Sequence, residues 1–106
     1  MLLVLSNWLL VAAFAGAGVF NALGTSSTQE SFVRWGYPRW WCRVTGASEI
    51  VVAALIAVTI TRPIGLILGA VIIAAAIFTV LRHREWSHLA PLSIFAALIA
   101  LTTLAW

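Results

Sequence analysis

The sequence predicts an all-α fold, an antiparallel bundle of four transmembrane helices with an aromatic interfacial loop between the first two. Three observations lead to this prediction. The chain of 106 residues is 63% hydrophobic and only 8% charged, whereas soluble domains carry about 25% charged residues. Its apolar residues are gathered in four runs of near-spanning length, and most of its charged residues lie between those runs. So few charges cannot cover a globule in water, and we therefore expect lipid to be the solvent.

Each apolar run is expected to be a helix, because backbone polar groups in lipid must be satisfied within their own segment. About 20 apolar residues in a helix cross the hydrocarbon core. The expected helices are residues 2–23, 42–61, 64–81 and 89–106. The loop 24–41 joins the first two. The other two connections are short, so consecutive helices should run antiparallel in a single domain, residues 1–106.

Glycine and proline mark the expected helix ends. Gly24 should close the first helix, while Pro63 and Pro91 lie where the third and fourth begin. In these positions glycine relaxes the backbone and proline loses no helical hydrogen bond.

Small residues indicate where helices approach one another. Gly65 and Gly69 form a G-x-x-x-G pattern in the third helix, and Gly16 and Gly18 are placed to do similar work in the first. We assign these glycines to packing within the bundle, and a homodimer face stays as the alternative.

The side chains capable of chemistry or recognition are concentrated between residues 34 and 49. The sequence Gly36-Tyr37-Pro38 predicts a tight turn. Around it lie the aromatic residues Trp35, Trp40 and Trp41, at a density that an interfacial anchor does not require.

Two arginines flank these rings, and together they suggest a binding surface. Rings beside Arg34 and Arg39 could hold a planar ring or an anionic head group. Anchoring of the loop at the lipid head groups is the alternative. The candidate ligand-binding residues are Arg34, Trp35, Tyr37, Arg39, Trp40, Glu49 and His83.

Glu49 is the acidic residue placed deepest in an apolar run. It heads a stripe of small residues with Ala53 and Ala57, so it should face the bundle interior. A carboxyl group there must be paired or protonated, and ionisable groups inside membranes are functional by default. We interpret Glu49 as a proton carrier or hydrogen-bonding group for a ligand. An ion pair with Arg39 or Arg43 is the structural alternative.

His83 is the second candidate for proton chemistry. It follows Thr79 at helical spacing, and it should lie at the same membrane face as Glu49 because their helices are antiparallel. The alternative is an ordinary interfacial histidine, next to a surface ion pair between Arg82 and Glu85. Glu49 and His83 are therefore the candidate catalytic residues.

The composition excludes several function classes. Two His and one Cys without ligand spacing argue against a metal site, and no intrinsic cofactor is expected. The net charge of +3 comes from arginines that flank membrane segments, which favours lipid head groups over nucleic acid as partners. Five of the arginines lie in the first and third connections or directly beside them, so the positive-inside rule places those connections in the cytoplasm and both termini outside the cell membrane.

The chain resembles the DoxX-like family of small four-helix membrane proteins. The resemblance rests on the turn Gly36-Tyr37-Pro38 and on the start of the second helix, from Gly46 to Glu49, and it extends to His83. Many members carry a basic residue late in the first helix, where this chain has Asn21. We therefore expect loop arginines to be the partners of Glu49.

The family is associated with a terminal quinol oxidase, with thiosulfate:quinone oxidoreduction and with complexes for oxidative-stress defence. The resemblance thus implies a quinone or another lipid-like ligand and a redox-protein partner, in an accessory subunit rather than a stand-alone enzyme. Two other functions stay open. One is a non-catalytic assembly partner, and the other is a small proton-coupled transporter, although the exporters of this size use a Glu in the first helix and this chain has none there.

Overall fold

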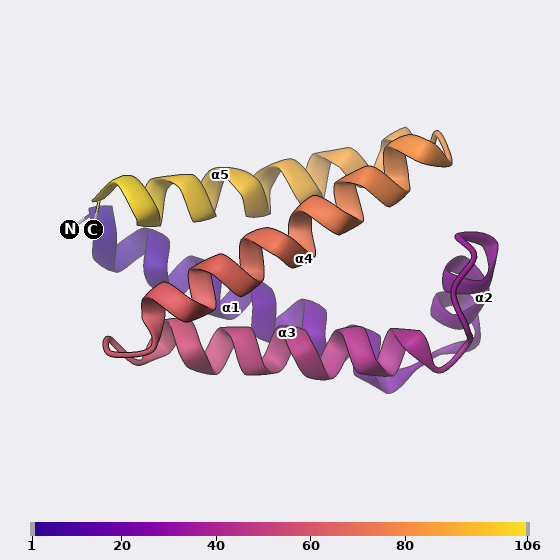
Figure 1. Cartoon of the computed structure of the whole chain (residues 1–106), viewed down its shortest axis with the longest axis horizontal. Helices are drawn as coiled ribbons and strands as arrows, with labels where there is room; N and C mark the ends of the chain where they lie inside the picture. The colour runs from indigo at the N-terminus through magenta and orange to yellow at the C-terminus, as the bar shows by residue number, and fades with distance from the viewer. Residues whose placement is uncertain (1, 106) are drawn as a thin grey trace.

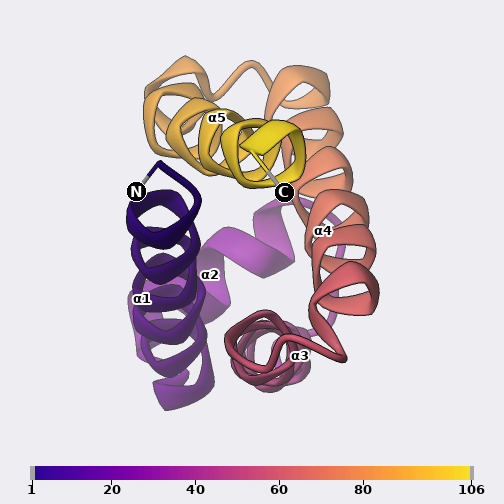
Figure 2. The ribbon, with the colours of Figure 1, turned by 90° about the vertical axis from the view of Figure 1, so that its left-hand side faces the viewer.

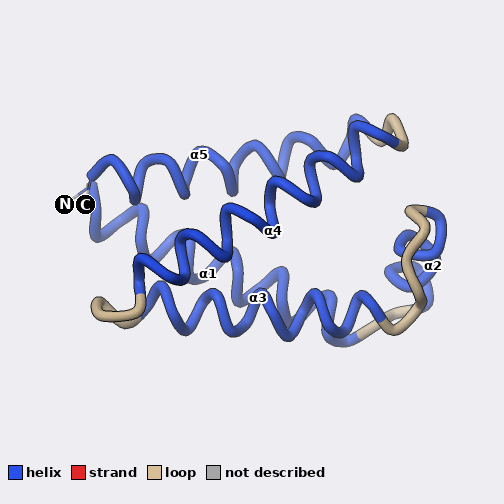
Figure 3. The backbone as a smooth tube through the Cα atoms, in the orientation of Figure 1, coloured by secondary structure: helices blue, strands red, loops and turns tan. Residues whose placement is uncertain are grey.

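The computed structural model describes residues 2–105 and is helical almost throughout (Figures 1 and 3). The elements in order are α1 (Leu2–Leu23), α2 (Ser26–Arg34), α3 (Trp41–Ala57), α4 (Arg62–Arg82), the short 3₁₀ helix η1 (Trp86–His88) and α5 (Leu89–Ala105). The described residues contain no strand, so the all-α prediction is confirmed. The predicted position of Trp106 in the last helix lies outside the described residues.

Three of these helices, α1, α4 and the segment Trp86–Leu104, are long and apolar enough to cross a membrane. α3 is shorter, at 17 residues. Large apolar side chains such as Ile67 and Phe78 are about two-thirds exposed on the outer surface of the protein. A soluble protein could not leave so many of them in water, so these helices indicate a small membrane protein.

α1, α3, α4 and α5 surround a common axis, and α2 lies across the end opposite the two termini (Figure 2). α1 packs most extensively on α3, and α5 packs against both α4 and α1. The core fills the half near the termini, where Phe14 is fully buried and meets Phe95 edge-on at 5.0 Å between ring centroids. The half near α2 is therefore the part in which a cavity has room to form.

Glycines set the closest helix crossings. A Cβ on Gly46 would lie 2.4 Å from Ala22 N, and one on Gly18 would lie 2.8 Å from Gly46 O. Gly65 meets Ile56 of α3 in the same way. These contacts confirm the interpretation as packing within the bundle. Gly16 is the exception, because it is exposed and nothing lies within 4 Å of its Cβ position.

Two expected boundaries were wrong. The second long helix ends at Ala57 instead of residue 61, because Val58 is extended and the chain turns. The carbonyls left at that end accept hydrogen bonds from Thr61 Oγ1 and Arg62 Nε, which satisfies them without another helical turn. Half of the expected loop 24–41 is the helix α2 of 9 residues, capped by Thr25, whose Oγ1 accepts from Thr28 N.

Candidate functional site

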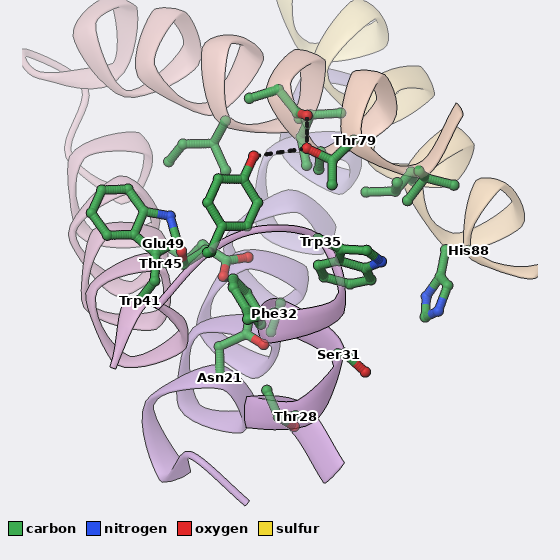
Figure 4. A pocket seen from close by; sticks show the side chains of 18 of the residues that line it. Asn21, Thr28, Ser31, Phe32, Trp35, Trp41, Thr45, Glu49, Thr79 and His88 are labelled. Atoms are coloured by element: carbon green, nitrogen blue, oxygen red, sulfur yellow. Dashed lines mark hydrogen bonds between the residues drawn. The ribbon is translucent and has the colours of Figure 1, made fainter. Parts of the chain in front are cut away.

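A cavity of ≈ 550 Å³ opens among the helices beneath α2. This volume lies within the range of about 300–1,000 Å³ that is typical of small-molecule sites. Each of the α-helices contributes several residues to its walls, whereas η1 contributes only His88. α2 forms the cover of the cavity. Figure 4 shows the labelled side chains gathered around this space from several elements.

The walls of the cavity differ in chemistry. α4 and α5 present mainly apolar side chains, among them Ile72, Ala76 and Phe95. The opposite side carries the polar groups of α1, α2 and α3. These groups are Asn21, Ser27, Thr28, Ser31, Thr45, Ser48 and Glu49. A ligand with one polar edge and one apolar edge would match both sides.

Glu49 is 5% exposed and faces the interior, as its place in the small-residue stripe predicted. Asn21 Nδ2 donates a hydrogen bond to Glu49 Oε1 at 2.6 Å. The glycine crossing of Gly18 and Gly46 brings α1 and α3 close enough for these short side chains to meet. The expected ion pair between Glu49 and a loop arginine is not formed among the described residues, and the neutral Asn21 takes that place. Glu49 Oε2 has no hydrogen-bond partner within the described chain.

The predicted tight turn at Gly36 ends α2. Gly36 has a φ of +91°, a conformation that favours glycine. Gly36 N donates to Val33 O and Tyr37 N donates to Phe32 O, which satisfies the last carbonyls of the helix. The rings of Phe32 and Tyr37 pack over this cap at 6.1 Å between centroids. Pro38 disfavours any continuation of the helix after this turn, and Tyr37 lines the cavity.

Aromatic side chains cover the mouth of the cavity. Phe32 is buried below Trp35, with 5.2 Å between the ring centroids, and Tyr37 stacks on Trp41 at 6.2 Å. Tyr37 Oη lies 2.9 Å from Thr79 Oγ1, and this hydrogen bond is drawn at Thr79 in Figure 4. Because the Thr79 hydroxyl donates to Ala75 O, Tyr37 is the donor. The turn after α2 is thus fastened to α4.

Glu85, in the linker between α4 and η1, pairs with Arg34 and not with Arg82 as expected. Arg34 Nη2 donates to Glu85 Oε1 at 2.7 Å, and Arg34 Nε donates to Oε2 at 3.2 Å. Trp35 Nε1 also donates to Oε2. The hydrogen bond from Arg34, together with that from Trp35, lowers the pKa of Glu85 below its ordinary value. The carboxylate of Glu85 therefore stays ionised and holds the end of α2 over the cavity.

The predicted ligand-binding residues divide into two groups. Trp35, Tyr37 and Glu49 line the cavity together, as proposed from the sequence. The structure places four others outside its lining. These four are Arg34, Arg39, Trp40 and His83.

His83 lies beside the end of α4, and its Nδ1 is 2.9 Å from Thr79 O. The backbone then turns through Arg84, at φ +56°, and the following linker brings His88 to the cavity instead. We expected His83 and Glu49 to lie together, but only Glu49 lines the cavity.

Sequence reasoning missed several residues of the site. Asn21 was noted only as a departure from the family pattern, although an amide near a buried carboxyl group is itself a signal of a hydrogen bond. The cap of Thr25 and the buried Phe32 could have revealed α2. Thr79 and His88 carried no local signal, because their roles depend on residues about 40 or more positions away.

Comparison with known proteins places this arrangement in a family. No curated protein and no solved structure matched the chain. The model of the DoxX-like family matches residues 5–102, which include all the residues that line the cavity. The chain therefore belongs to the DoxX-like family.

Proposed function

We propose that the cavity binds a quinone or another ring-bearing, lipid-like molecule, and that the protein acts as the ligand-binding subunit of a membrane oxidoreductase. The observation that carries this proposal is the two-sided cavity beneath α2, with apolar walls from α4 and α5 and a buried carboxyl group opposite. Membership in the DoxX-like family also supports it, because the family resemblance implies a quinone or another lipid-like ligand.

The aromatic cover suits a planar ring. Trp35, Tyr37 and Trp41 line the mouth, and the nearly parallel rings of Tyr37 and Trp41 support a stacked arrangement of a ligand ring there. Ring faces gain about 0.5–1.5 kcal/mol per aromatic contact beyond their buried area. An apolar tail would lie along α4 and α5, whose outer surface is already adapted to lipid.

Glu49 is the group that we assign to the polar end of the ligand. Asn21 fixes one carboxyl oxygen at 2.6 Å and leaves the other without a protein partner. That second oxygen would exchange a hydrogen bond, and in turnover a proton, with an oxygen of the ligand ring. His88 lines the same cavity, so in this proposal it replaces His83 as the second proton-handling residue.

In this proposal α3 also crosses the membrane, which completes a four-helix antiparallel transmembrane bundle. Its 17 residues span about 26 Å at 1.5 Å per residue, slightly less than the hydrocarbon core, so the bilayer would thin locally. The arginine-rich end that bears α2 would face the cytoplasm, with both termini outside. Cysteine accessibility in oriented vesicles tests this orientation.

Quenching of tryptophan fluorescence by a short-tailed ubiquinone analogue tests the proposed function. We expect saturable quenching of the purified wild type in detergent micelles, because Trp35 and Trp41 line the cavity. Glu49→Gln should weaken binding and abolish its dependence on pH. Glu30→Gln, a change of the same kind at an exposed position of α2, should bind like the wild type.

The outcomes separate the candidate functions. Non-saturable quenching in the wild type would contradict the proposal and favour a non-catalytic assembly role. Binding that is unchanged in Glu49→Gln, including its pH dependence, would make Glu49 structural.

A further inference from the structure

α2 is held over the cavity by few contacts. Among the helices of the described chain it packs appreciably only on α3. Its residues Thr28, Ser31 and Phe32 nevertheless form part of the cavity lining. Because α2 packs on one helix only, its position over the cavity depends on the contacts made at its C-terminal end.

Side chains of three residues within a short segment fasten that end to the other side of the mouth. Arg34 and Trp35 both donate to Glu85, and Tyr37 donates to Thr79 two residues further on. These side chains come from one side of the cavity, and their acceptors lie on α4 and the linker after it. Residues 34–37 therefore form a strap that bridges the opening.

Glu85 accepts the hydrogen bonds of both Arg34 and Trp35, although it does not itself line the cavity. It holds Trp35, which does line it, and its Oε1 is 3.6 Å from Nε2 of His88, another lining residue. The rings of Trp35 and His88 meet edge-on, with 5.7 Å between their centroids. Loss of the carboxylate would release two parts of the mouth together.

We propose that Glu85 is a positioning residue that latches residues 34–37 across the mouth of the cavity, and that opening of this latch admits the ligand. This inference rests on the proposed function for the identity of the ligand. The latch itself controls how readily small molecules reach the cavity, and this accessibility can be measured with no ligand present.

The test is the rate at which a small water-soluble maleimide labels a cysteine placed in the cavity wall. The variant Thr45→Cys supplies that thiol, in a background with Cys42→Ala to remove the buried native cysteine. Val58→Cys, on the exposed turn at the opposite end of the bundle, serves as the control site.

We expect Glu85→Gln to raise the labelling rate at Thr45→Cys about two- to tenfold, the range expected for loss of an exposed charged contact. The rate at Val58→Cys should not change. Glu30→Gln removes a second carboxylate near Arg34 that forms no salt bridge with it in the described chain, so this variant controls for the loss of charge alone and should change neither rate. An unchanged rate at Thr45→Cys, or an equal rise at both sites, would overturn the latch.

The dependence of the labelling rate on salt provides a second measurement, with Glu85→Gln as its control. Raising the ionic strength should speed labelling at Thr45→Cys when Glu85 is present, because an exposed ion pair is screened. It should have no such effect in Glu85→Gln, and salt-independent labelling in both proteins would contradict the proposal. A Glu85-dependent labelling rate without quinone binding would refute the proposed function alone. Quinone binding with labelling insensitive to Glu85 would refute the latch alone.

Discussion

Replacement of Gly46 by alanine should separate α1 from α3 and disturb the site at Glu49. The added Cβ would lie 2.4 Å from Ala22 N and 2.5 Å from Gly18 O. Both neighbours are backbone atoms of α1, so no side chain can swing aside to relieve the clash. Ordinary contact begins near 3.4 Å, and the two helices must therefore move apart by about 1 Å.

The magnitude follows from this displacement. Overpacking of a close crossing costs about 1–3 kcal/mol of folding free energy. The same movement would lengthen the hydrogen bond between Asn21 Nδ2 and Glu49 Oε1 from 2.6 Å to roughly 3.6 Å, which is no longer a hydrogen bond. One methyl group should thus reduce both stability and ligand binding.

The assay is reversible unfolding in mixed micelles, followed by helical circular dichroism, together with the quinone titration. Gly16→Ala is the matched control, because it is also a helical glycine of α1 but has nothing within 4 Å of its Cβ position. It should be neutral or more stable than the wild type by about 0.5–1 kcal/mol, since alanine favours a helix. Equal stabilities of the two variants would refute the reasoning that the glycine crossing sets the helix distance.

Three further predictions follow from individual contacts. Thr102→Val should be neutral or stabilising, because the Thr102 hydroxyl is fully buried without a hydrogen-bond partner in the described chain, so a loss of more than about 1 kcal/mol would show that it is bonded. Gly36→Ala should cost about 1–2 kcal/mol of backbone strain at φ +91° with no clash. Hydrogen exchange should then be faster in α2 than in α4, and uniform protection would argue against this. The stability that the Glu85 latch contributes should be present above the ordinary carboxyl pKa and be lost as the pH falls through the lowered pKa of Glu85. The difference in melting temperature between the wild type and Glu85→Gln should therefore vanish in acid, and a difference that persists below that pKa would contradict the ion pair.

The sequence was sufficient to predict those features that depend on local patterns. The apolar runs located all four long helices, because lipid requires each run to satisfy its own backbone. The stripe of Glu49 and Ala53 correctly predicted an inward carboxyl group, since residues four apart share a helix face. The turn at Gly36 was also predicted from the local sequence, because a φ of +91° favours glycine.

Features that depend on distant contacts could not be predicted. Arg82 lies three residues from Glu85, yet Arg34 binds the carboxylate, because the end of α2 reaches across the mouth of the cavity to the linker after α4. His83 follows the helical spacing, but α4 ends at Arg82, so that spacing no longer sets its direction. Asn21 pairs with Glu49 only because the glycine crossing brings their helices together. None of these arrangements leaves a periodic signal in the sequence.

The most direct test of the central claim is mass spectrometry of lipids extracted from the purified protein. Ala76 lines the cavity on α4, and Ala76→Phe would fill part of that space, whereas Ala74→Phe adds the same ring at an exposed position of α4 outside the lining. We predict that the wild type and Ala74→Phe retain a quinone or another ring-bearing lipid, and that Ala76→Phe loses it. Absence of such a lipid from the wild type, or equal retention by all three proteins, would contradict the assignment of the cavity as a ligand site.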